Sequence, residues 1–278
     1  MTSALLAIAL LYPTVARTGT NLLERAAWTH GKDEPGAIAF ATAQGGPLSA
    51  TGRVYRVETF RQTSAYWHTR AKALPGREYL FGCWLRIDHA TVLLWTRGRN
   101  AETGAEDQFR LYCKSGFQPY LKPYISPEVA QRLGGDPAEW RLCFRMLRFQ
   151  KRLAGDTLYV SAGCYGSTGA VQIADPFLVD VTDCTDWTLT AELRGCRPVT
   201  RMELFRVGIR DLVWKRAFER PVTDGSFTVP ADLADFRLGQ EEEANFINGH
   251  GLDVFHADGS SQTVFAPQEH VYRVWTDY

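Results

Sequence analysis

The stretch YLFGCWLRI, residues 79–87, decides the fold class. Its alternate positions carry apolar side chains, namely Tyr79, Phe81, Cys83, Leu85 and Ile87. Successive side chains of a β-strand point to opposite faces of the sheet, so a period of two predicts a strand with a buried face. The same period recurs at residues 109–113 and 158–164. These three stretches predict a protein built from strands.

Further short candidate strands surround these three, and turn-forming residues separate them. They span residues 37–41, 54–60, 65–69, 92–96, 140–149 and 171–173, with Gly, Pro, Asn or Asp between many of them. Ser126 and Pro127 fit the start of a short helix, and Gly134 fits its end. No helical pattern is long enough to alternate with strands as in an α/β protein, so we expect an all-β sandwich.

A second run of strands follows a polar stretch at residues 180–186. In residues 187–193 the inward positions are Trp187, Leu189, Ala191 and Leu193, and the outward positions are Thr188, Thr190 and Glu192. Asp258-Gly259 lies between two later candidates as a hairpin turn. We predict two tandem β-sandwich domains, a jelly roll over residues 21–182 and a smaller immunoglobulin-like sandwich over residues 183–278.

Residues 1–11, MTSALLAIALL, form an apolar segment at the N-terminus. A signal peptide has a basic residue before its apolar run, but the first basic residue here is Arg17. The run is shorter than the roughly 20 residues of a membrane span, so no membrane insertion is expected. We expect residues 1–20 to be an uncleaved arm that docks on its own domain or on a neighbouring subunit. The docking side chains would be Leu5, Leu6, Ile8, Leu10 and Leu11.

Charge and cysteine content exclude several classes of function. Lysine plus arginine equals aspartate plus glutamate, 31 each, so no global field attracts nucleic acid. The six cysteines are Cys83, Cys113, Cys143, Cys164, Cys184 and Cys196, and none forms a C-x-x-C pair of a zinc or redox site. We favour reduced cysteines that pack as small hydrophobes. A disulfide framework remains open because six is even.

No sequence signature of a common enzyme class is present. The chain lacks G-x-S-x-G, H-E-x-x-H and Walker motifs, and its six histidines have no metal-ligand spacing. Acid pairs such as Glu106-Asp107, or Asp183 with Asp186, could serve a glycosidase, but they lie in predicted turns, where acids are usually solvated. We therefore expect a protein that is not an enzyme, with a polysaccharide hydrolase as a less favoured alternative.

Aromatic and basic residues on two predicted strands favour a sugar site. Tyr66 and His68 share one side of a strand, while Trp95 and Arg97 end another beside a polar loop. Aromatic faces stack on sugar C–H groups, and polar neighbours fix the orientation of the ligand. We predict Tyr66, His68, Trp95 and Arg97 as ligand-binding residues. The alternative, that Trp95 is core like Trp67 and Trp84, stays open.

The first predicted domain resembles the jelly rolls of carbohydrate-binding modules. Residues 74–86, LPGREYLFGCWLR, resemble their "PG-x-x-Y-x-F-S-x-W-x-R" strand, and residues 169–178, GAVQIADPFL, resemble their closing "G-x-V-x-I-x-D-P-x-L" strand. Asn21-Leu22-Leu23 and Trp140-Arg141 also fit, so the resemblance covers roughly residues 20–181. It implies glycan binding and a structural Ca²⁺ with Asp175 as the candidate ligand, although Asp175 could simply cap the turn at Pro176. No other cofactor is expected.

Residues 12–22, YPTVARTGTNL, resemble the linking segments in tail and appendage proteins of tailed bacteriophages. Residues 223–229, TDGSFTV, are similar to a "T-D-x-x-G-x-F" hairpin of small sandwich domains in phage virions and of carboxypeptidase-regulatory-like domains, but the expected R-x-x-G turn is missing. The resemblance implies a structural part of a phage tail, tip, fibre or baseplate. It would assemble with other virion proteins and copies of itself and could attach to host glycans. The alternatives are a free, extracellular carbohydrate-binding protein or adhesin, and a capsid decoration protein.

Overall fold

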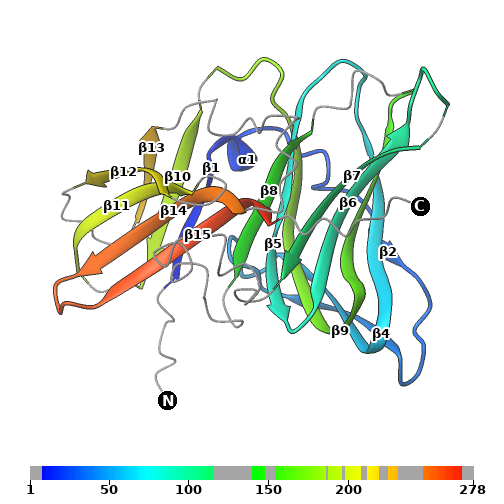
Figure 1. The fold of residues 1–278 in the computed structure, drawn as a ribbon, viewed down its shortest axis with the longest axis horizontal. Coiled ribbons are helices and arrows are strands. Elements are labelled where there is room, and N and C mark those ends of the chain that lie inside the picture. Colours follow the sequence, from blue (N-terminus) through cyan, green and yellow to red (C-terminus); the bar gives the residue numbers. More distant parts are fainter. Residues whose placement is uncertain are drawn as a thin grey trace.

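The chain folds into two β-sandwiches that lie side by side (Figure 1), as a computed structural model shows. The structure describes residues 8–104, 106–114, 140–147, 154–185, 187–195, 198–207, 212–218, 225–230 and 247–270. Within these ranges the only helix is the four-residue α1, Val15–Thr18, so the predicted all-β class is confirmed. The helix expected from Ser126 to Gly134 lies outside the described residues.

Within the described residues, the first sandwich contains eight strands. They are β2 (Thr29–His30), β3 (Ile38–Gln44), β4 (Arg53–Lys72), β5 (Tyr79–Asp88), β6 (Thr91–Arg99), β7 (Glu106–Lys114), β8 (Arg141–Leu147) and β9 (Thr157–Asp180). β4 and β9 are long antiparallel partners that run through both sheets of this sandwich. Every other strand of the sandwich pairs with one end of them or with a neighbour.

The two long strands differ from the sequence-based expectation of four short ones. Residues 54–60 and 65–69 are one strand, β4, and residues 158–164 and 171–173 are one strand, β9. The β4–β9 register shifts between Thr59 and Ala65. Opposite this break, Gly166 and Gly169 take positive φ angles of 54° and 122°, which glycine adopts at little cost. The glycines therefore bend the strand from one sheet into the other instead of ending it.

We name the two sheets of the first sandwich by what their outer faces do. The junction sheet contains β3, the first half of β4, the second half of β9, β5 and β8. The platform sheet contains β2, the second half of β4, the first half of β9, β6 and β7. Between them lies a buried cluster that includes Tyr55, Trp67, Phe81, Leu94 and Ile173. Cys83, Cys143 and Cys164 are free and buried here, packed as small hydrophobes.

Seven of the described strands form the second sandwich, in two sheets. One sheet has the order β1 (Ile8–Pro13), β10 (Thr188–Arg194) and β13 (Gly225–Pro230). The other has the order β12 (Leu212–Phe218), β11 (Val199–Val207), β14 (Ile247–His256) and β15 (Ser261–His270). The Asp258-Gly259 turn joins β14 to β15 as predicted, with Gly259 at a φ of 83°.

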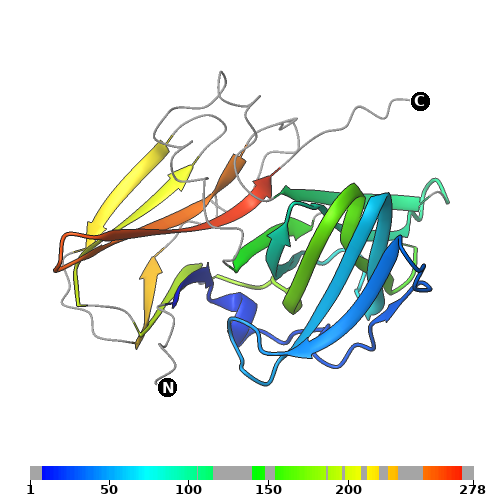
Figure 2. The same cartoon turned by 90° about the horizontal axis from the view of Figure 1, so that it is seen from below.

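The N-terminal segment is a strand of the second sandwich and not a free arm. β1 pairs antiparallel with β10 from Ile8 opposite Arg194 to Pro13 opposite Leu189. Figure 2 shows this dark blue strand beside the yellow-green β10. Leu10 and Leu11 are buried, with Leu11 0% exposed, so they cannot dock on a neighbouring subunit. Leu5 and Leu6 lie outside the described residues, as does the side chain of Ile8.

The two sandwiches share one apolar cluster. The outer face of the junction sheet contributes Leu80, Trp84, Leu142, Phe144, Met146, Phe177 and Val179, and the second sandwich contributes Leu11, Leu189, Met202, Leu252 and Val254. The rings of Tyr12 and Trp84 meet edge to face, with centroids 6.2 Å apart. Gly82 permits this packing, because a Cβ there would lie 2.6 Å from Cβ of Phe144. The second sandwich is thus built onto the first rather than linked by a flexible tether.

Candidate functional site

Six side chains lie on the outer face of the platform sheet and form the first candidate site. They are Tyr66, His68 and Arg70 of β4, Trp95 and Arg97 of β6, and Tyr159 of β9, and we call them the platform. β9 runs between β4 and β6, so Tyr159 lies in register with Arg70 on one side and Arg97 on the other. In the next row, Ser161 lies between His68 and Trp95.

The platform side chains contact one another through their rings and guanidinium groups. The Cζ atom of Arg70 lies 4.9 Å from the ring centroid of Tyr159. Arg97 reaches two rings, with Cζ 5.4 Å from the centroid of Tyr159 and 4.8 Å from that of Trp95. The rings of Tyr66 and Trp95 are 6.3 Å apart and nearly perpendicular. Cation–π contacts of this kind hold flat groups in place on the sheet.

Exposure increases along the face from one row to the next. In the row of Tyr66, Leu93 is buried and Tyr66 is half-buried. Trp95 and Arg97 are also half-buried, whereas His68 and Arg70 are exposed and Tyr159 is 37% exposed. A ligand would therefore reach the end formed by Arg70, Tyr159 and His68 most readily. Trp95 is half-buried, so part of its ring packs into the protein and the rest stays open to a ligand.

The platform has a locally positive electrostatic environment. The pKa of His68 is lowered from its ordinary value, first by burial, then by the charge of Arg97 and by His30. Burial is the largest cause of the shift, and the positive charge of Arg97 adds to it because a neighbouring cation disfavours the imidazolium form. At neutral pH His68 is thus an uncharged imidazole that can donate or accept a hydrogen bond.

The structure brings together all four predicted ligand-binding residues, Tyr66, His68, Trp95 and Arg97, on one face. Sequence analysis missed Arg70 and Tyr159. Both carried a signal: Arg70 continues the period of two after Tyr66 and His68, and Tyr159 occupies the outward phase between Leu158 and Val160.

Trp67 and Trp84 belong to the core, as expected from the sequence. Trp67 lies inside the first sandwich and its indole N–H donates to the carbonyl of Arg56 at 2.9 Å. Trp84 lies in the apolar cluster that the two sandwiches share. Neither indole faces the platform, so only Trp95 of these three tryptophans is a candidate for ligand contact.

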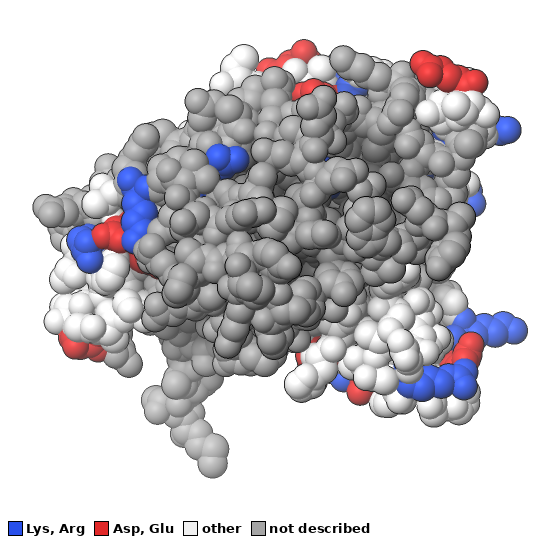
Figure 3. All heavy atoms as spheres, viewed as in Figure 1, with Lys and Arg blue, Asp and Glu red and all other residues white. Residues whose placement is uncertain are grey.

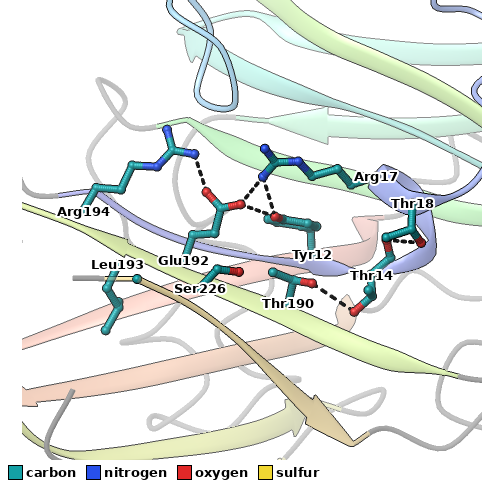
Figure 4. Close-up of a pocket in the computed structure, with 10 residues that line it drawn as sticks. Tyr12, Thr14, Arg17, Thr18, Thr190, Glu192, Leu193, Arg194 and Ser226 are labelled. Atoms are coloured by element: carbon teal, nitrogen blue, oxygen red, sulfur yellow. Dashed lines mark hydrogen bonds and ion pairs between the residues drawn. The ribbon is translucent and has the colours of Figure 1, made fainter. Parts of the chain in front are cut away.

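A second candidate lies where β1 and α1 meet β10 (Figure 4). The carboxylate of Glu192 accepts hydrogen bonds from the hydroxyl of Tyr12 and from the guanidinium groups of Arg17 and Arg194. Burial and the hydrogen bond to Glu192 raise the pKa of Tyr12 to about 12. These groups border a cavity of about 660 Å³. The sequence predicted that Glu192 points outward from β10, and its side chain is only 6% exposed because Tyr12, Arg17 and Arg194 surround its carboxylate.

The Glu192 cluster works as a clamp between the sandwiches. Arg194 also donates to the carbonyl of Pro47 at 3.2 Å, in the loop between β3 and β4 of the first sandwich. Burial alone would raise the pKa of Glu192, but the hydrogen bonds from Tyr12 and Arg194 and the charge of Arg17 outweigh it, so the pKa is lowered. A carboxylate with its acceptor positions already occupied is a structural element, and the platform is therefore the better ligand site.

Asp175, the candidate Ca²⁺ ligand, has a positive φ of 45° and borders a second cavity of about 530 Å³. Its carboxylate accepts the backbone N–H of Leu48 at 3.2 Å, and burial raises its pKa. Among the described residues, no group of three metal-ligating side chains gathers around it or elsewhere. One carboxylate facing an N–H donor does not fit a cation site. The Ca²⁺ expectation therefore stays a prediction from sequence resemblance.

The acid pairs considered for hydrolysis lie partly outside what the structure describes, and Glu106 and Asp107 belong to the strand β7 rather than to the predicted turn. Asp183 accepts a hydrogen bond from Arg77 at 2.8 Å, and Asp186 lies outside the described residues, as do the side chains of Glu106 and Asp107. Within the part of the chain that the structure describes, no helix is long and apolar enough to cross a membrane. On the face of the molecule seen in Figure 3, the described charged side chains include both basic and acidic ones.

No protein-family model matches the chain, and no curated protein sequence is similar to it. Among solved structures, a domain of tailspike protein 4 of bacteriophage CBA120 is 13% identical over 62% of this chain and 19% of that chain, with a TM-score of 0.35. The CBM22-1–GH10 modules of xylanase 10B from Clostridium thermocellum are 14% identical over 58% and 27%, with a TM-score of 0.36. The family 11 carbohydrate-binding module of Lic26A-Cel5E from the same organism is 10% identical over 58% and 93%, with a TM-score of 0.32. Similarities this distant assign no role to any residue here.

Proposed function

We propose that this chain binds carbohydrate through the platform. The observation that supports it is the placement of three aromatic rings, Tyr66, Trp95 and Tyr159, on one outer face of three adjacent strands. Polar side chains lie between and beside these rings, namely His68, Arg70, Arg97 and Ser161. An outer face that served only stability would not need this combination.

The chemistry of the platform suits a sugar ring. Aromatic faces pack against the C–H groups of a pyranose, and N–H groups of arginine and histidine donate hydrogen bonds to its hydroxyls. Because the side chains stand on paired strands, their spacing is fixed before the ligand arrives, which lowers the entropic cost of binding. The proposal assigns no catalytic step to any residue.

A glycan array with the intact protein tests this function. We expect binding to at least one oligosaccharide, and a loss of about tenfold or more in affinity for Tyr159→Ala and Trp95→Ala. Phe60→Ala is the matched control, because Phe60 is an aromatic residue of β4 that is 55% exposed away from the platform. Absence of binding to every glycan, or equal losses in all three variants, would overturn the proposal.

We further propose, on the sequence resemblance, that the chain performs this binding as a structural part of a phage particle. The shared apolar cluster supports it, since two sandwiches that pack as one body can carry a binding face at a fixed orientation. The alternative is a free carbohydrate-binding protein or adhesin. Mass spectrometry and immunogold labelling of purified particles discriminate between them. Detection of the protein in the particles supports the virion role, and absence of the protein from the particles favours the free protein.

A further inference from the structure

The arginines of the platform carry information about the kind of sugar. The hydroxyl groups of a neutral polysaccharide can be recognised by uncharged side chains such as asparagine and glutamine. The platform instead has two guanidinium groups, those of Arg70 and Arg97, on either side of one ring, Tyr159. Guanidinium groups recognise carboxylates through two parallel N–H···O bonds, a geometry that a hydroxyl cannot match.

Among the described side chains of the first sandwich, Glu34 pairs with Arg61, Glu58 with Arg56, and Asp180 with Arg77. Asp156, directly before β9, pairs with Lys72 at 3.4 Å. Among the described residues, no carboxylate lies within ion-pair distance of Arg70. The exposed end of the platform thus has cations beside an aromatic ring without an internal counter-charge on Arg70.

We propose that the platform selects acidic polysaccharides, with a sugar ring on Tyr159 and its carboxylate on the guanidinium groups of Arg70 and Arg97. This inference rests on the proposed function and names its ligand class. The lowered pKa of His68, caused first by burial and then by Arg97, supports a positive field at the same place. Nucleic acid, another polyanion, fits less well, because the chain has no net positive charge to attract an extended phosphate backbone.

Uronic-acid polysaccharides and their carboxyl-reduced derivatives test the proposal, because reduction replaces each carboxylate by a neutral alcohol on the same backbone. Polygalacturonate, alginate and hyaluronan, each with its reduced form, are titrated by calorimetry into the intact protein. We expect at least one acidic form to bind about tenfold more tightly than its reduced form, with an affinity that falls as salt rises.

Three arginine variants assign that selectivity to the platform. Arg70→Gln and Arg97→Gln should each lower the affinity for the acidic form about five- to tenfold and lower the affinity for the reduced form by a clearly smaller factor. Arg61→Gln is the matched control, since Arg61 is an exposed arginine paired with Glu34 elsewhere on the same sandwich. Arg70 is exposed, so its variant keeps the test valid even if Arg97→Gln unfolds.

The outcomes separate this inference from the function on which it rests. Equal binding of acidic and reduced forms, with loss in Tyr159→Ala, would overturn the acidic class and leave carbohydrate binding intact. No binding in the array and in these titrations would overturn both. An oligothymidylate that binds as tightly as the best acidic polysaccharide, with the same loss in Arg70→Gln, would identify a general polyanion surface and overturn the inference.

Discussion

The two outer faces of the first sandwich are built on the same two long strands, β4 and β9, but they differ in the polarity and in the exposure of their side chains. On the junction sheet these strands present Val54, Ala174, Phe177 and Val179, which are buried in the apolar cluster that the two sandwiches share. On the platform sheet they present Tyr66, His68, Arg70 and Tyr159, which are half-buried or exposed. One pair of strands thus carries a permanent interface at one end and a face open to ligands at the other.

The composition of each outer face indicates whether the chain itself or a ligand covers it. The outer face of the junction sheet is apolar, and other parts of the same chain cover it. Leaving such a face in water would cost about 25 cal/mol for each Å² of apolar surface. The platform, with its rings and guanidinium groups, is stable in contact with water, so these groups stay available to bind a ligand. The predictions below test this division, and the largest effects belong to the junction.

The largest effect is expected at β1. Leu11→Asp places a charge without a partner among Leu189, Ala191 and Val254 and should lower the free energy of unfolding by about 4 kcal/mol or more. The same substitution at Leu74, which is 47% exposed, should cost about 0.5 kcal/mol or less. Urea unfolding of both variants measures this. A fully stable Leu11→Asp protein would restore the docking-arm hypothesis for the N-terminus.

A slightly smaller effect is expected from Trp84, the largest fully buried side chain of the junction. Trp84→Ala removes the ring that contacts Tyr12 and should cost about 3–5 kcal/mol, whereas Tyr159→Ala on the platform should cost less than about 1 kcal/mol. Thermal unfolding followed by circular dichroism compares the two. Equal losses of stability would contradict the division between a structural face and a binding face.

The clamp at Glu192 should make stability depend on pH. Its lowered pKa means that the ionised form stabilises the fold fully above the ordinary value of 4.5 and loses this contribution as pH falls through the lower folded value. Glu192→Gln should therefore cost about 1–3 kcal/mol at pH 7, and its stability should fall less than that of the wild type between about pH 5 and pH 3. The control is Glu58→Gln, in a surface pair with Arg56. Parallel pH curves for wild type and Glu192→Gln would refute the clamp.

The smallest effect is expected at His68. Nuclear magnetic resonance titration should give its imidazole a pKa below 6.5, and Arg97→Gln should raise that value because the nearby positive charge is lost. Arg61→Gln should leave it unchanged, because Arg61 is not among the groups that shift it. An unshifted pKa in Arg97→Gln would show that burial alone acts on His68 and would remove one support for the acidic ligand.

Much of the fold followed from local pattern. The alternation at residues 79–87 and 187–193 and the Asp258-Gly259 turn predicted strands and a hairpin that the structure contains. The pattern failed where glycines bend a strand without ending it, as in β9 near Gly166, because a bend and a turn need the same backbone freedom. The pattern predicted the outward phase of Glu192 on β10 correctly, but it gave no sign that other side chains cover this face.

The sequence by itself determined the all-β class and which side of each strand carries Tyr66, His68, Trp95 and Arg97, because the period of two is a local property of the backbone. Only the tertiary structure decided which strands stand beside each other, and so that Tyr159 lies between Arg70 and Arg97. It also decided that Leu10 and Leu11 complete the second sandwich. Such strand pairings join residues that lie far apart in the chain. The burial of whole apolar faces selects them, and a local period in the sequence cannot encode that selection.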